Sequence, residues 1–262
     1  HQVMQDVELE TEFRQALHHA EIELSYLPVV DFNTGQVHAL ESRLFWQHPQ
    51  RGLLQQEQLS ALAEQSHLTV ELDKYTISII DRTYTELLKQ HDESIELHVM
   101  LSSQHLKHKH VLRSLKNTLK QTQLNLSHLW LFFNEKALVQ ETENHINGFE
   151  LLQKLGVKLG ISHYGSGYSA LNSLLFLPIK GLKLDANLTK QIHAEQQLKL
   201  MSAYQKTAST LELQTFVDGI DSPEQKRIFS ELGYQLGQGA ALADTFTLSD
   251  TQSQICTQLE YA

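Results

Sequence analysis

The chain has 262 residues, a net charge of −10 and 41% hydrophobic residues. This length suits one large domain, and the acidic balance argues against non-specific binding to DNA or RNA, which needs a basic surface. The single cysteine, Cys256, excludes an internal disulfide framework and fits a reducing cytosol. The sequence contains no apolar run of about 18 residues that would predict a transmembrane helix, and it shows no signal peptide.

The first part of the chain predicts helices around a strand pair. Leu9, Phe13 and Ala16 recur at helical spacing near the start. The turn around Gly35 separates two β-prone segments, which indicates an antiparallel hairpin. The predicted elements are a helix at 1–21, strands at 23–30 and 36–45, a loop at 49–54, and helices at 56–65 and 69–90.

From residue 94 onwards, strand and helix patterns alternate. The expected strands are 94–101, 129–133, 158–161, 181–184, 213–217 and 234–239. The expected helices are 106–120, 137–155, one that opens near Ser169, 188–211, one that starts after Ser222, and a short last one. Alternation of this kind predicts a parallel sheet, and eight strands predict closure into a barrel. The hairpin would make one strand antiparallel to the rest.

The segment 158–177 predicts a buried strand, a polar turn and an amphipathic helix. Gly165 and Gly167 bracket Ser166, and glycines permit turn conformations that other residues avoid. Their amide groups could attract an anion. The residues that lead into this turn are Ser162 and His163, whereas a phosphate-and-metal site needs carboxylates there.

Several motifs, in order and at matching gaps, resemble the EAL domain, the family named for a Glu-Ala-Leu motif in bacterial cyclic di-GMP phosphodiesterases. The resemblance covers about residues 21–247. It implies an α/β fold, a modified TIM-type (β/α)8 barrel with one antiparallel strand. We expect residues 1–262 to form a single domain excised from a longer chain. The motifs are Tyr26-Leu27-Pro28-Val29-Val30, Trp46-Gln47-His48-Pro49, Gly165-Ser166-Gly167-Tyr168-Ser169-Ala170-Leu171, Leu182-Lys183-Leu184-Asp185 and Gly237-Gln238-Gly239.

In that family, two divalent cations at the barrel mouth activate the water that attacks a phosphodiester. The resemblance places the family's site residues on positions that differ in this chain, where the name-giving motif is Glu41-Ser42-Arg43. Ligand contacts fall on Leu27 and Phe45, and metal ligands fall on Met100, Phe132, Ser162, His163 and Asp218. The retained polar residues are Glu41, Lys183, Asp185, Asp218 and Gln238.

These replacements lead to expectations about activity and ligands. Met and Phe side chains cannot bind Mg²⁺ or Mn²⁺, which select oxygen ligands. Apolar side chains at the strand ends should also make the mouth smaller and drier. We therefore expect a degenerate EAL domain that is not an enzyme, has no catalytic residues, metal or other cofactor, and does not bind cyclic di-GMP.

Some polar residues permit two interpretations. Glu41 and Lys183 suit either a salt bridge in the barrel mouth, which we favour, or surviving catalytic groups. We expect His163 to be a structural residue, with a role as ligand of a soft transition metal as the alternative. His105, His108 and His110 lie in a basic segment that reads as a solvated helix face, with contact to RNA or a metal as the alternative.

The pattern of replacements most resembles the CsrD/MshH-type regulators of small-RNA turnover. That likeness implies a regulatory domain that binds a protein, the unphosphorylated glucose-specific EIIA protein of the phosphotransferase system. It also implies RNase E-dependent small-RNA turnover, and a cytoplasmic domain whose parent chain is anchored in the inner membrane. The alternatives are a cyclic di-GMP sensor, a residual phosphodiesterase, and direct RNA binding through Lys107–Lys120. The oligomeric state stays open.

Overall fold

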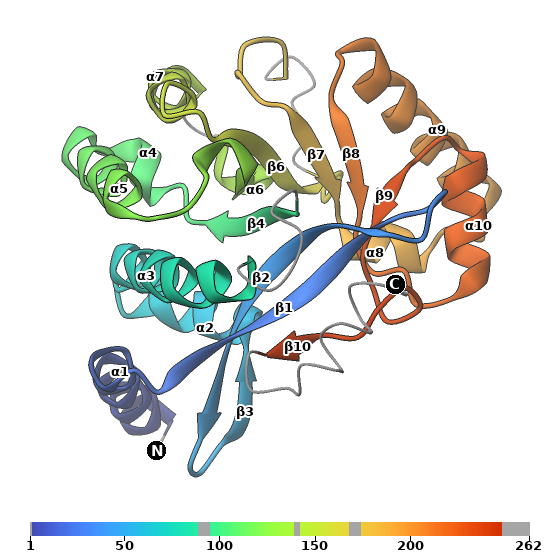
Figure 1. Cartoon of the computed structure of the whole chain (residues 1–262). Helices are drawn as coiled ribbons and strands as arrows, with labels where there is room; N and C mark the ends of the chain where they lie inside the picture. Colours follow the sequence, from blue (N-terminus) through green and yellow to red (C-terminus); the bar gives the residue numbers. More distant parts are fainter. Residues whose placement is uncertain (1, 89–94, 139–141, 168–173, 248–262) are drawn as a thin grey trace.

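A barrel of eight strands forms the centre of the molecule (Figure 1). The computed structural model describes residues 2–88, 95–138, 142–167 and 174–247. Within these ranges, β1 runs antiparallel to both β2 and β9, and the other barrel neighbours run parallel. This confirms the predicted modified TIM-type barrel. The barrel strands are β1 (Ile22–Asp31), β2 (Val37–His48), β4 (Glu96–Leu101), β5 (Leu129–Asn134), β6 (Lys158–Tyr164), β7 (Gly181–Leu184), β8 (Gln214–Val217) and β9 (Leu236–Gly237).

Helices surround this barrel (Figure 1). The amphipathic helix α10 begins at the capping box that the sequence predicts, in which Ser222 and Gln225 satisfy each other's backbone N–H groups. None of the described helices is both long and apolar enough to cross a bilayer. The helices are α1 (Gln2–His19), α2 (Gln56–Gln65), α3 (Thr69–Leu88), α4 (Gln104–Lys107), α5 (Lys109–Gln121), η1 (Leu126–His128), α6 (Glu135–Leu138), α7 (Thr142–Gln153), α8 (Ala186–Lys190), α9 (Glu195–Thr210) and α10 (Pro223–Glu231).

Three predicted elements differ from the structure. Strand β3 (Gly52–Gln55) begins inside the expected loop 49–54, because the ring of His48 accepts backbone N–H groups and closes a tight turn back onto β2. The helix predicted at 106–120 is broken into α4 and α5 by the extended residue His108. The helix predicted at 188–211 is divided into α8 and α9 by a turn that buries Ile192.

Other differences lie near the ends of the described ranges. Strand β10 (Phe246–Thr247) pairs with β1 and was not predicted. The helix expected at 137–155 corresponds to α6 and α7, which flank residues 139–141. The helix expected near Ser169 and the last short helix fall outside the described residues.

Large aromatic rings fill the middle of the barrel. Trp130 and Phe132 stack at 5.5 Å between ring centroids, and Phe216 meets both rings edge-on. Two glycines make this possible: a Cβ on Gly160 would lie 2.4 Å from the Phe132 ring, and one on Gly181 would lie 2.8 Å from the Trp130 ring. The aromatic layer forms the floor on which the polar groups of the mouth rest.

Candidate functional site

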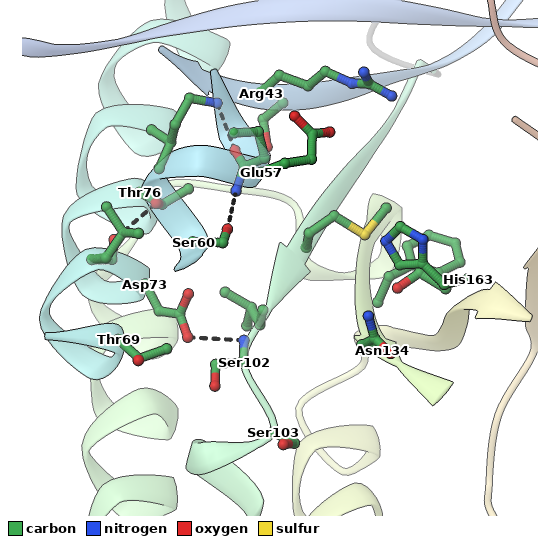
Figure 2. Close-up of a pocket in the computed structure, with 18 of the residues that line it drawn as sticks. Arg43, Glu57, Ser60, Thr69, Asp73, Thr76, Ser102, Ser103, Asn134 and His163 are labelled. Carbon is green, nitrogen blue, oxygen red and sulfur yellow. Dashed lines mark hydrogen bonds between the residues drawn. The ribbon is translucent and has the colours of Figure 1, made fainter. Parts of the chain in front are cut away.

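A cavity of about 500 Å³ opens at the carboxyl ends of the barrel strands and extends sideways between α2, α3 and the start of α4. Figure 2 shows Arg43 on one side of this cavity, with His163 and Asn134 on another. Barrel enzymes place their sites at this end of the strands. The cavity therefore has the position expected for a ligand site.

A buried ion network lies at the base of the cavity. Lys183, which is 2% exposed, donates to Glu41 Oε2, and Gln238 Nε2 donates to the same oxygen at 2.9 Å. Arg43 Nε donates to Glu41 Oε1 at 2.9 Å. Burial alone raises the pKa of Glu41, but Lys183 and Arg43 outweigh burial and hold this pKa well below its usual range. The predicted salt bridge between Glu41 and Lys183 is confirmed.

Asp218 is the second carboxylate of this network. It lies 3.6 Å from Arg43 Nη2 and accepts from Gln238 Nε2 at 3.1 Å. Burial, followed by the charge of Glu41, raises the pKa of Asp218 above its ordinary value. Arg43 lies 3.6 Å from Asp218 but 2.9 Å from Glu41, so an incoming anion would compete mainly with Asp218 for this guanidinium.

His163 lies within hydrogen-bond distance of Asp185 at the rim, where its Nδ1 is 3.1 Å from Asp185 Oδ2. Its φ of +54° is unusual for a residue with a side chain, and the β6–β7 register shifts at this point. Asp185 Oδ1 accepts from Asn187 N and caps α8. These contacts give His163 and Asp185 structural partners. They also leave the imidazole half exposed at the cavity.

The side arm of the cavity is lined by hydroxyl groups that sequence reasoning did not single out. Figure 2 shows Thr69 and Asp73 of α3 facing Ser102 and Ser103 after β4. Asp73 Oδ2 accepts from Ser102 N at 3.0 Å and contacts His105 Nε2 at 2.9 Å. These residues come from separate segments, so no spacing in the sequence brings them together.

The histidines of the basic segment differ from one another. His105 is fully buried beside Asp73, so the expectation of a solvated face is wrong for this residue. It faces inward because α4 packs its inner side on the core. His108 and His110 are exposed and stack at 5.7 Å, as a solvated face predicts.

The donors at the mouth do not fit the pair of divalent cations that the family resemblance implies. Met100 and Phe132 occupy paired positions on β4 and β5, and Ser162 follows on β6. They offer a thioether, a ring and a hydroxyl, where hard cations need several carboxylate oxygens. Among the residues that the structure describes, no group of three or more His, Cys, Asp or Glu side chains suits a metal ion.

The remaining predicted positions lie around the mouth. Leu27 lines a second cavity of about 480 Å³, together with His163, Asp185 and Asp218. Phe45 is half-buried on β2, where it pairs with Gln55 of β3. Arg43 was quoted as part of a motif but not predicted as a site residue. Its alternation with Glu41 along β2, which places both on the same face of the strand, was the available signal.

Comparisons with known proteins identify relatives of this chain in sequence and in fold. A solved structure described as "PaMucR Phosphodiesterase, c-di-GMP complex" superposes with a TM-score of 0.85 and 28% identity, covering 95% of this chain and 98% of that one. Cyclic di-GMP phosphodiesterase NbdA of Pseudomonas aeruginosa is 31% identical over 236 residues, which are 90% of this chain and 30% of NbdA. The bifunctional diguanylate cyclase/cyclic di-GMP phosphodiesterase MucR, from the same species, is 28% identical over 91% of this chain and 35% of MucR.

These relatives correct one prediction. The expectation that the chain is not an enzyme is wrong by this comparison, because the relative that is 31% identical is named as a phosphodiesterase. Replacements at single positions predicted a loss of activity, whereas the similarity extends over 90% of the chain. The chain spans about a third of the length of these curated relatives. The likeness to CsrD/MshH-type regulators and the degenerate status stay predictions.

The family itself follows from the extent of the match. The family model described as "EAL domain" matches residues 10–245. This range includes all the barrel strands and the ion network at the mouth. The chain belongs to the EAL domain family.

Proposed function

We propose that this domain acts in cyclic di-GMP signalling and binds the dinucleotide in its barrel mouth. The observation that carries the proposal is the cavity of about 500 Å³ beside Arg43 and Lys183, at the end of the barrel where binding sites form. It is supported by the 28% identical structure with a TM-score of 0.85, which is described as a cyclic di-GMP complex.

The chemistry of the mouth suits a phosphodiester with attached nucleosides. Arg43 offers a planar fork that matches phosphate oxygens, and it would exchange the more distant Asp218 for the ligand. The hydroxyl-lined arm provides donors and acceptors for sugar or base groups. A volume of about 500 Å³ lies within the usual range of small-molecule pockets.

Binding and cutting are separate questions for this site. Hydrolysis, the activity for which the relatives are named, would open one phosphodiester to give the linear dinucleotide. Binding without hydrolysis would make the domain a sensor. Both functions place the dinucleotide against Arg43, so one set of variants tests both.

The test is isothermal titration of the domain with cyclic di-GMP, with and without Mn²⁺, followed by chromatography of the nucleotide. We expect binding, and we expect Arg43→Gln to weaken it by about 10- to 100-fold, the range for a hydrogen bond to a charged group. Arg227→Gln is the matched control, because Arg227 lies exposed on α10. Absence of heat at millimolar ligand would overturn the proposal and restore the expectation that the mouth does not bind cyclic di-GMP.

A second candidate function is favoured by one surface observation. Leu175 and Phe176 are 63% and 62% exposed, and adjacent exposed apolar side chains suit a protein interface. On this candidate, the domain binds the unphosphorylated glucose-specific EIIA protein. It would then link that protein to RNase E-dependent turnover of small RNAs, within a parent chain anchored in the inner membrane.

Titration with unphosphorylated EIIA tests this candidate. Leu175→Ser with Phe176→Ser should abolish the interaction, whereas the control Leu53→Ser alters an exposed leucine on β3 and should not affect it. Unchanged binding by the double variant would exclude this surface, and absence of any binding would exclude this partner.

A further inference from the structure

His98 occupies an unexpected place at the centre of the barrel. It lies on β4, is fully buried, and packs against the rings of Trp130, Phe132 and Phe216 with centroid distances of 4.8–5.8 Å. Its Nδ1 lies 3.4 Å from Lys183 Nζ. Its Nε2 has no hydrogen-bond partner within the described part of the chain.

The contact with Lys183 fixes the proton of the imidazole. An ammonium group donates hydrogen bonds and cannot accept them, so Nδ1 must present its lone pair to Lys183. The ring proton then resides on Nε2. Burial, followed by the charge of Lys183, lowers the pKa of His98 well below its usual value, in agreement with a neutral ring.

The surroundings show why an imidazole matters here. A phenylalanine would fill a slot between aromatic rings without leaving a polar atom unpartnered, which is costly in a protein interior. Unlike a phenylalanine ring, the imidazole also provides a hydrogen-bond acceptor, Nδ1, which faces Lys183. Lys183 is held from the mouth side by Glu41 and by Gln238 Oε1 at 3.3 Å, so His98 supplies its contact from the aromatic layer.

We propose that His98 is a positioning residue that holds the Lys183 ammonium at the base of the mouth cavity through a neutral, Nε2-protonated imidazole. The effect on ligand binding rests on the proposed function of the mouth. The placement of Lys183 does not, and it is measured without any ligand.

The first arm is nuclear magnetic resonance of the ¹⁵N-labelled domain at pH 7. We expect the His98 ring, assigned through its contacts with Trp130 and Phe216, to carry its proton on Nε2. We also expect His98→Phe to shift the Lys183 Nζ resonance and His98→Asn, which retains an acceptor near the Nδ1 position, to restore it. A proton on Nδ1, or an unchanged Lys183 resonance in His98→Phe, would overturn the inference. The tautomer is read on the wild-type domain, so this arm does not depend on the folding of a variant.

The second arm is titration with cyclic di-GMP. We expect His98→Phe to bind about tenfold more weakly, as for a lost hydrogen bond to a charged group, and His98→Asn to bind within about threefold of the wild type, since it keeps that bond. Leu236→Val, which changes an apolar side chain in the same barrel layer, is the packing control. Equal affinity of His98→Phe and the wild type would contradict the inference. Absence of binding by the wild type would defeat the proposed function alone, and the resonance arm would still decide the role of His98.

Discussion

Lys183→Met tests the ion network that forms the base of the cavity. Lys183 and Glu41 have side chains that are only 2% and 4% exposed, so water does not screen their interaction. Removing one partner of a buried pair typically costs about 3–5 kcal/mol. Arg43 and Gln238 still hold Glu41 in this variant. We therefore expect the free energy of unfolding to fall by about 3 kcal/mol, the lower end of this range. At this chain length, that corresponds to a melting temperature lower by about 6–12 °C.

The pH dependence of this loss has a definite sign. In the wild type, the pKa of Glu41 is depressed, so its contribution to stability is present above the unfolded pKa of about 4.3 and is lost as the pH falls toward the folded pKa. In Lys183→Met, Arg43 is the one remaining cation of the network that lowers the pKa of Glu41 against the effect of burial. The pKa of Glu41 should therefore be higher in this variant than in the wild type. Protonation of Glu41 at low pH then removes the buried charge. The stability gap between the two proteins should therefore narrow as the pH falls from 7 to 4.

The assay is urea unfolding of the wild type, Lys183→Met, Glu41→Gln and the double variant at pH 7 and pH 4. We expect the double variant to lose less than the sum of the single losses, because the two residues interact directly. Lys199→Met, which removes an exposed partner of Glu195, should change stability little. Additive losses, or a gap that widens as the pH falls, would refute this reasoning.

Three further predictions concern other parts of the barrel. Burial alone raises the pKa of Glu96, but the groups that donate hydrogen bonds to it outweigh burial and lower this pKa to about 2. Glu96→Gln should therefore lower the free energy of unfolding by about 1 kcal/mol at pH 7 and by progressively less below about pH 4. Chemical unfolding at several pH values measures this difference. Gly160→Ala places a Cβ 2.4 Å from the Phe132 ring and should destabilise by about 1–3 kcal/mol, with partial rescue by Phe132→Leu in a thermal melt. Ser222→Ala removes the helix cap it forms with Gln225 and should cost about 1 kcal/mol; unaltered urea midpoints for these variants would contradict the contacts described.

The barrel was predictable because its signals are local. Strand β5 is a short apolar run, and the capping box of Ser222 is visible in four consecutive residues. The breaks in the two long helices were not visible, because tertiary packing decides them. His108 is extended between α4 and α5, and Ile192 turns into the core between α8 and α9, although the surrounding residues suit continuous helices.

The site was predictable in part. The motif match predicted that Glu41 and Lys183 both lie at the barrel mouth, although they are 142 positions apart in the chain. The structure confirms their ion pair. Asp73 and His98 could not be found in this way. Asp73 acquires its role from α3 packing against the end of β4, and His98 acquires its role from the position of the Lys183 ammonium. Both depend on distances across the fold that no local pattern encodes.

A crystal structure of this domain grown with saturating cyclic di-GMP would show whether the barrel mouth is the binding site. We expect electron density for the dinucleotide in the mouth cavity, with a phosphate beside Arg43 in place of Asp218. An empty mouth under these conditions, or a dinucleotide bound only elsewhere on the surface, would contradict the proposed binding site.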